Sequence, residues 1–172
     1  MIRQSRLEGI RALLLDLDDT LLSNSMDDFL PTYLHLISNF AAEHYKPDYF
    51  VEQMMASTRE MASNTDPTVT NEEAFWNGFS RRTGADPEQL VPFFARFYET
   101  VFNRLEAKTK RRSQAQPLVQ WALDSGYRVV IATNPMFPRI AVDRRLAWAG
   151  IEGFNFHLVT SYENMHLSLI HI

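Results

Sequence analysis

Residues 12–18, ALLLDLD, are the stretch that decides the fold of this 172-residue chain. A short, continuous apolar run that ends abruptly in acidic residues is typical of a strand buried on both faces. The run is also shorter than an average helix. We therefore predict a buried strand whose carboxyl end carries Asp16 and Asp18, both on the same side of the chain if the strand continues through them.

Residues 25–112 predict a bundle of about four helices. Pro47 is placed to open the second helix, Thr70 and Glu73 form a capping box for the third, and Asp86 is placed to cap the fourth. The first helix has apolar residues at steps of three and four along one face, namely Phe29, Tyr33, Leu36, Ile37 and Phe40. The middle of the chain is therefore expected to be helical throughout.

Beyond this middle the pattern alternates between helices and strands. We expect a helix at 116–125, a strand at 128–134, a helix at 138–149 and a strand at 156–160. Such alternation predicts a parallel sheet. The fold class is therefore expected to be α/β, with the helical middle inserted after the first strand.

Composition excludes several classes of protein. Apolar residues make up 45% of the chain, enough to form a core, so intrinsic disorder is excluded. The absence of cysteine excludes disulfides, zinc–thiolate sites, iron–sulfur clusters and cysteine nucleophiles. A net charge of −4 argues against a nucleic-acid partner. No apolar run reaches the roughly 18 residues of a membrane span, and the first residues do not resemble a secretory signal, so we expect no membrane association and a cytoplasmic location.

Two predicted strands end in polar residues, at Asp16 and Asp18 and at Thr133 and Asn134. Ligands of parallel α/β sheets bind beyond the carboxyl ends of the strands. Two neighbouring carboxylates remain ionised most easily beside a cation, and oxygen ligands without thiols favour a hard ion such as Mg²⁺. These four residues are therefore the candidate site.

Residues 16–22, DLDDTLL, closely match the first motif of the haloacid dehalogenase (HAD) superfamily, and residues 131–134, IATN, look like its second motif. The helical insertion sits where that family carries a cap of the C1 type. The resemblance covers almost the whole chain. It implies a HAD-like, Rossmannoid parallel-sheet core over 1–24 and 113–172, of which only the first three strands are present, and a helical cap over 25–112.

The resemblance implies a role for each candidate residue. Asp16 would attack phosphorus and form an aspartyl-phosphate, and Asp18 would act as acid and then as base. Mg²⁺ would be held by the Asp16 carboxylate and the Asp18 backbone carbonyl. The Thr133 hydroxyl and backbone N–H groups, including that of Asn134, would hold the phosphoryl oxygens. Because dehalogenases of the family lack an acid at the position of Asp18, the motif favours a Mg²⁺-dependent phosphatase acting on a small phosphorylated metabolite.

The sequence departs from the family near residue 169. The resemblance leads one to expect a Lys there, but the residue is Leu169, no Lys follows Lys110, and no later acidic pair occurs. We therefore expect a truncated reading of a longer gene, with an exposed apolar edge at the first strand, poor solubility and no activity on its own. A phosphomutase of the same superfamily and a non-catalytic phosphate-binding fragment remain the alternatives.

Other notable residues have ordinary structural interpretations. We expect Asp19 to serve the structure of its loop and the basic run at 108–112 to be a solvated linker. The aromatic residues of the helical middle are expected to form its core, and the five histidines have no metal-ligand spacing.

Overall fold

The computed structural model describes residues 8–167, and Leu169 therefore lies outside the described part. Within that part, a three-stranded parallel sheet has the order β1 (Ala12–Leu15), β4 (Arg128–Ile131), β5 (Leu158–Val159). Leu15 pairs with Ile131, which in turn pairs with Val159, so the carboxyl ends of the three strands lie side by side. The predicted α/β fold class is confirmed.

The first strand is less buried than its sequence predicts. Among the described strands β1 pairs only with β4, so it forms an edge of the sheet. Leu14 is 69% exposed, whereas Leu17, just beyond the strand, is fully buried. The expectation of burial on both faces is therefore wrong for β1, because no described element covers the Leu14 face.

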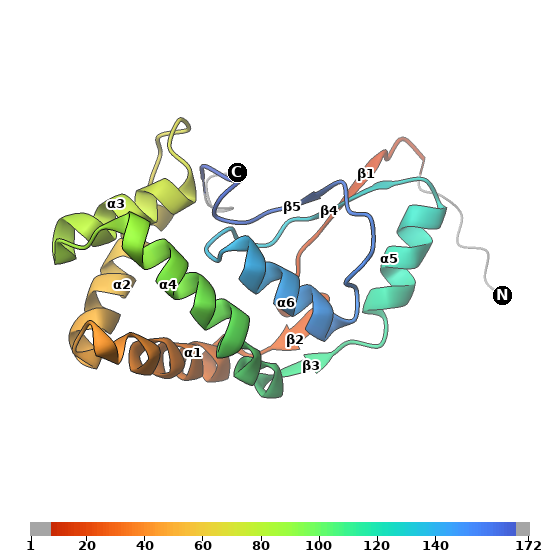
Figure 1. Ribbon diagram of the computed structural model, residues 1–172. Coiled ribbons are helices and arrows are strands. Elements are labelled where there is room, and N and C mark those ends of the chain that lie inside the picture. Colours follow the sequence, from red (N-terminus) through yellow and green to blue (C-terminus); the bar gives the residue numbers. More distant parts are fainter. Residues whose placement is uncertain (1–7, 168–172) are drawn as a thin grey trace.

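Helices fill the middle of the chain, as predicted, and lie together at one end of the molecule (Figure 1). They are α1 (Met26–Phe40), α2 (Pro47–Ala62), α3 (Asn71–Thr83) and α4 (Pro87–Thr100), with short 3₁₀ helices η1 (Ala41–Glu43) and η2 (Phe102–Lys108). Pro47 opens α2, and the capping box of Thr70 and Glu73 forms at the start of α3. The Asp86 carboxylate caps α4 by accepting from the Glu88 N–H at 2.9 Å.

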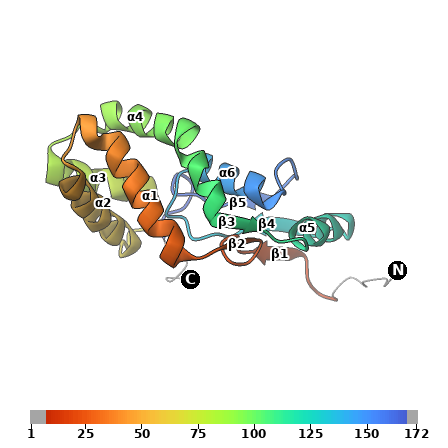
Figure 2. The ribbon, with the colours of Figure 1, turned by 90° about the horizontal axis from the view of Figure 1, so that it is seen from below.

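Two short strands at the base of these helices were not predicted. β2 (Leu22–Asn24) pairs with β3 (Thr109–Arg111) in an antiparallel ladder, where the chain enters and leaves the helical segment (Figure 2). Each strand has only three residues and no alternating apolar pattern, so periodicity gives no signal for it. We propose that the inserted cap is bounded near this ladder, with residues 25–112 forming one unit.

The remaining helices connect the sheet to the insertion. α5 (Ala115–Asp124) packs on β4, whereas α6 (Arg139–Ala149) contacts β2, β3, η2 and α4. One apolar cluster runs from Phe50 in α2 through Phe102 to Ile131 in β4. The helical segment and the sheet therefore share a core. Within residues 8–167, no helix combines the length and the apolar character needed to cross a membrane.

Candidate functional site

The chain turns sharply where β1 ends. The carbonyl of the buried Leu17 accepts hydrogen bonds from the backbone N–H groups of Thr20, Leu21 and Leu22, at 3.3, 2.9 and 2.9 Å. Asp19 has a φ of 57°, in the left-handed region that asparagine and aspartate tolerate better than most residues. The strand therefore does not continue through residues 16 and 18 as the sequence analysis assumed, and a tight turn carries both carboxylates instead.

The Asp18 carboxylate is held by three side chains. Its Oδ1 accepts from Asn24 Nδ2 at 3.0 Å, and its Oδ2 accepts from Thr133 Oγ1 at 3.4 Å. The same Oδ2 is ion-paired with the guanidinium of Arg145. The structure thus brings together residues that follow β1 and β4, as predicted for Asp18 and Thr133, and adds Asn24 and Arg145.

Arg145 is a buried cation that the sequence analysis missed. Its side chain is 2% exposed, its Cζ lies 4.7 Å from the centroid of the Phe137 ring, and its Nε donates to the Ala141 carbonyl at 3.3 Å. A buried charge is costly unless it is paired, and Asp18 supplies the counter-charge. One signal was available: Arg145 follows Ala141 by four residues, so it falls on the buried face of α6.

Asp16 is less constrained than Asp18. Its Oδ2 accepts from the Thr20 hydroxyl at 2.9 Å, within the turn, and its side chain is partly exposed. Arg112, which lies far from this turn in the sequence, also binds the turn. The Arg112 guanidinium donates to the backbone carbonyl of Asp19 at 2.8 Å and to its carboxylate at 3.2 Å.

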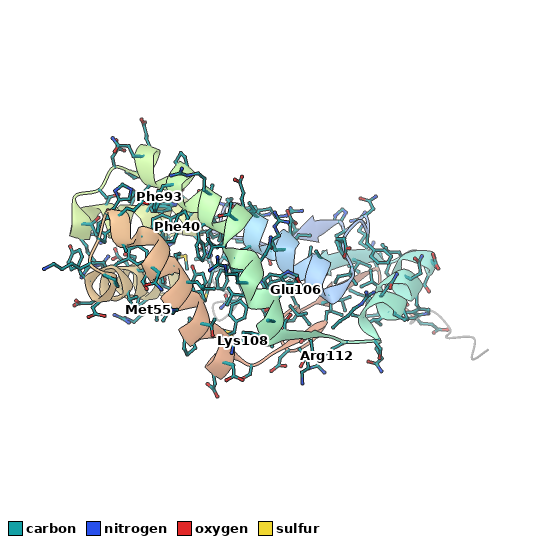
Figure 3. The ribbon with its side chains drawn as sticks, turned by 60° about the horizontal axis from the view of Figure 1, so that its bottom comes forward. Phe40, Met55, Phe93, Glu106, Lys108 and Arg112 are labelled. Carbon is teal, nitrogen blue, oxygen red and sulfur yellow. The ribbon has the colours of Figure 1, made fainter. Side chains whose placement is uncertain are left out.

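Arg112 shows that the basic run at 108–112 is more than a solvated linker. Figure 3 labels Lys108 and Arg112 where the chain returns from the helices. The pattern of charges gave no signal for this contact because Arg112 and Asp19 are 93 residues apart in the chain. Asn24 was missed for a different reason: it is only six residues from Asp18, but its position depends on the unpredicted strand β2.

The two residues after β4 have different surroundings. Thr133 is 1% exposed, and its carbonyl accepts from the Thr160 hydroxyl at 2.6 Å, so it is fixed between β4 and β5. Asn134 is exposed, and its side-chain amide contacts the Met136 sulfur at 3.0 Å. The Thr133 hydroxyl therefore reaches Asp18, while the Asn134 side chain is turned towards its own loop.

The resemblance implies that Mg²⁺ would be held by oxygen groups of the turn after β1. The described residues contain no cluster of three or more His, Cys, Asp or Glu side chains suited to a metal. Mg²⁺, however, is commonly bound through one or two carboxylates, together with water and phosphate oxygens. The Asp18 carboxylate is already bound by Asn24, Thr133 and Arg145, whereas among the described residues the Asp16 carboxylate accepts a side-chain hydrogen bond from Thr20 alone, so of the two carboxylates it is Asp16 that has room for a cation.

A cavity of about 290 Å³ lies between the helices α1–α4 and residues 136–140 and 162–163. Its walls are mostly apolar, and the aromatic residues among them include Tyr33, Phe50, Trp76, Phe79, Phe94 and Tyr98. The hydroxyls of Tyr33 and Tyr98 lie 2.9 Å apart and are buried. Burial raises the pKa of Tyr33 to about 12 and raises the pKa of Tyr98 well above its ordinary value. This cavity adjoins the loop that follows Thr133.

No protein-family model matches the sequence, and no curated protein sequence matches it significantly. Among solved structures, the chain is similar to a HAD phosphatase from Thermococcus onnurineus, with a TM-score of 0.48 and 19% sequence identity. The alignment covers 87% of this chain and 61% of that phosphatase, so the chain spans less than two thirds of the length of its structural relative.

Proposed function

We propose that the turn after β1 is the site of a phosphatase-type hydrolase that acts on a small phosphorylated metabolite through an aspartyl-phosphate. The observation that carries the proposal is the 3.4 Å contact between Thr133 Oγ1 and Asp18 Oδ2. It joins the two segments that resemble the first and second HAD motifs, at the carboxyl ends of neighbouring parallel strands.

Asp16 is the nucleophile in this proposal. Its carboxylate is partly exposed, and Thr20 occupies one lone pair of Oδ2 and orients the group. Attack of a carboxylate oxygen on phosphorus forms the acyl-phosphate bond as the bond between phosphorus and the ester oxygen breaks. Asp18 is less suited to this step, because both of its carboxylate oxygens already accept hydrogen bonds from protein side chains.

Asp18 serves as the acid and base. Thr133 and Arg145 both bind Oδ2, and Asn24 binds Oδ1. A carboxylate offers about four lone-pair sites, so Oδ1 retains one for proton exchange. Through Oδ1, Asp18 would give a proton to the leaving oxygen and later take one from the hydrolytic water.

The phosphoryl oxygens and the metal complete the proposal. Backbone N–H groups after β4, including that of Asn134, together with the Thr133 hydroxyl, would bind phosphoryl oxygens. Mg²⁺, held by the Asp16 carboxylate and the Asp18 carbonyl, would neutralise negative charge during transfer. The proposed roles are thus divided between the turn after β1 and the loop after β4, which lie at the carboxyl ends of paired strands.

A second candidate is a non-catalytic phosphate-binding chain. The ion pair of Asp18 with the buried Arg145 favours it, because an acid–base residue engaged in this way has fewer sites left for proton transfer. The two candidates differ at one step. Both bind phosphate at this turn, but only the phosphatase forms a covalent bond to Asp16.

A burst experiment separates the candidates. We expect the chain, mixed with p-nitrophenyl phosphate and Mg²⁺, to release at least one equivalent of p-nitrophenol per chain, one for each aspartyl-phosphate formed, and Asp16→Asn to release none. Asp27→Asn, which alters an exposed carboxylate of α1 outside the site, is the matched control and should behave like the unaltered chain. Absence of release with retained binding of inorganic phosphate would reject the phosphatase and support the binding chain.

A further inference from the structure

The cavity between the helices and the 136–140 loop has the properties of a ligand site. Its volume of about 290 Å³ is at the lower end of the range for small-molecule pockets. Met26, one of the lining residues, is 48% exposed, so the cavity reaches the surface. Met55 of α2, labelled in Figure 3, is another part of the wall.

The walls favour an apolar ligand. Phe50 and Phe79 are 1% exposed and stand edge to face, and Trp76 stands edge to face against Phe79. The hydroxyls of Tyr33 and Tyr98 are hydrogen-bonded to each other. The aromatic walls therefore offer mainly ring faces and edges, which suit apolar groups and cations more than strongly hydrated anions.

The charges at the cavity wall are negative. Glu72 and Glu163 both line it, and none of the described lining residues is Lys, Arg or His. Glu163 accepts from the Arg139 N–H at 2.8 and 3.0 Å, so it also serves the start of α6. Arg145, the guanidinium behind Phe137, is already ion-paired with Asp18. A ligand in this cavity therefore meets negative charge without a compensating cation.

Glu72 is a partly buried carboxylate of the cavity wall with a second carboxylate, Glu163, near it. Partial burial raises its pKa above the ordinary value, and repulsion from Glu163 raises it further, while a hydrogen bond from Tyr162 acts in the opposite direction. A positive charge between the two carboxylates would relieve this repulsion.

We propose that this cavity binds a small apolar molecule that carries a positively charged amine, with its apolar body against the aromatic walls and its ammonium group beside Glu72 and Glu163. The proposal does not depend on the phosphatase function, because it concerns a cavity separate from the turn after β1. Where both hold, the amine-bearing molecule is the alcohol part of the phosphate ester.

Calorimetric titration of the full chain with three probes of one shape tests the proposal. The probes are 4-phenylbutylamine, 4-phenylbutanol and 4-phenylbutyrate, which differ in charge and contain no phosphate. We expect the amine to bind about fivefold more tightly than the alcohol, as for a single partly exposed charge pair, and the carboxylate to bind most weakly. Equal affinity of the amine and the carboxylate, or no binding of the amine, would overturn the proposal.

Two variants locate the binding. Glu72→Gln should remove most of the amine's advantage over the alcohol and leave the alcohol's affinity unchanged, whereas Glu52→Gln, on the exposed side of α2, should preserve both. Ala95→Phe places a ring in the cavity and should weaken binding of the amine by at least about tenfold. Unchanged amine selectivity in Glu72→Gln would overturn the proposal even if Ala95→Phe fails to fold.

Discussion

At the scale of single residues, the candidate site depends on a charge pair that no local motif contains. Arg145 is among the largest fully buried side chains of the described part, and its ion-pair partner is Asp18. Its second terminal nitrogen, Nη2, has no hydrogen-bond partner within residues 8–167. The ion pair therefore fixes Asp18 against α6, while the Nη2 group of Arg145 remains a donor without an acceptor among the described residues.

Replacing one member of the Asp18–Arg145 pair should lower the free energy of unfolding more than replacing both. We expect Asp18→Asn to lower the free energy of unfolding by about 3 kcal/mol, because it leaves Arg145 buried without an anion. Adding Arg145→Met should then recover at least about 1 kcal/mol, since residues in one ion pair are energetically coupled. Urea denaturation of the two single variants and the double variant measures this coupling, and strictly additive costs would contradict it.

The residues found from the sequence and those missed differ in one physical respect. Asp16, Asp18 and Thr133 follow apolar runs directly, so strand ends point to them. Arg145 and Arg112 act across long separations in the chain, and only the packing of α6 and β3 brings them to the turn. Local patterns carry no information about such contacts.

At the scale of elements, the starts of α2, α3 and α4 have local causes that the structure reproduces. Thr70 and Glu73 cap α3, and Gly84 ends it with a φ of 72°. The polar ladder of β2 and β3 was not predictable, because its strands are stabilised by each other across the insertion. Strands that are stabilised only by pairing with a distant segment therefore cannot be predicted from residue propensities.

The buried hydrogen bond between Tyr33 of α1 and Tyr98 of α4 predicts that the folded state becomes less stable at alkaline pH. Burial raises the pKa of Tyr33 from 10.0 to about 12, so the folded state retains a proton that the unfolded chain releases first. The protonated Tyr33 phenol therefore contributes fully to the free energy of unfolding below pH 10. This contribution is lost as the pH rises from 10 towards 12. The free energy of unfolding should therefore fall across this range in urea titrations.

Two variants identify the source of that fall. Tyr33→Phe should make the decline between pH 10 and 12 shallower, because the buried phenol is gone. Tyr49→Phe, at a tyrosine that is 41% exposed, should leave the decline as it is in the unaltered chain. An equal slope in Tyr33→Phe and the unaltered chain would exclude Tyr33 as the cause.

At the scale of the whole molecule, one side of the sheet is open. β1 is an edge strand in the described part, and Leu14 and Ile10 are 69% and 43% exposed. Unpaired backbone groups beside exposed apolar side chains promote pairing with another chain. The same edge carries the candidate site at its carboxyl end.

This edge predicts self-association. We expect the average mass of the chain in analytical ultracentrifugation to rise with concentration, and Leu14→Lys to suppress the rise, because a charged side chain discourages strand addition. Leu118→Lys, which alters a 39% exposed leucine on α5, is the matched control and should have a smaller effect. A chain that stays monomeric at all concentrations would contradict the prediction.

The central claim, that Asp16 is a nucleophile beside a Mg²⁺ site, is tested most directly with beryllofluoride, a phosphate mimic that bonds to aspartate carboxylates. Fluorine-19 NMR of the chain with Mg²⁺ and beryllofluoride should give a protein-bound signal. The signal should persist in Asp27→Asn and vanish in Asp16→Asn or when Mg²⁺ is chelated. A bound signal that survives in Asp16→Asn, or its absence from the unaltered chain, would contradict the account.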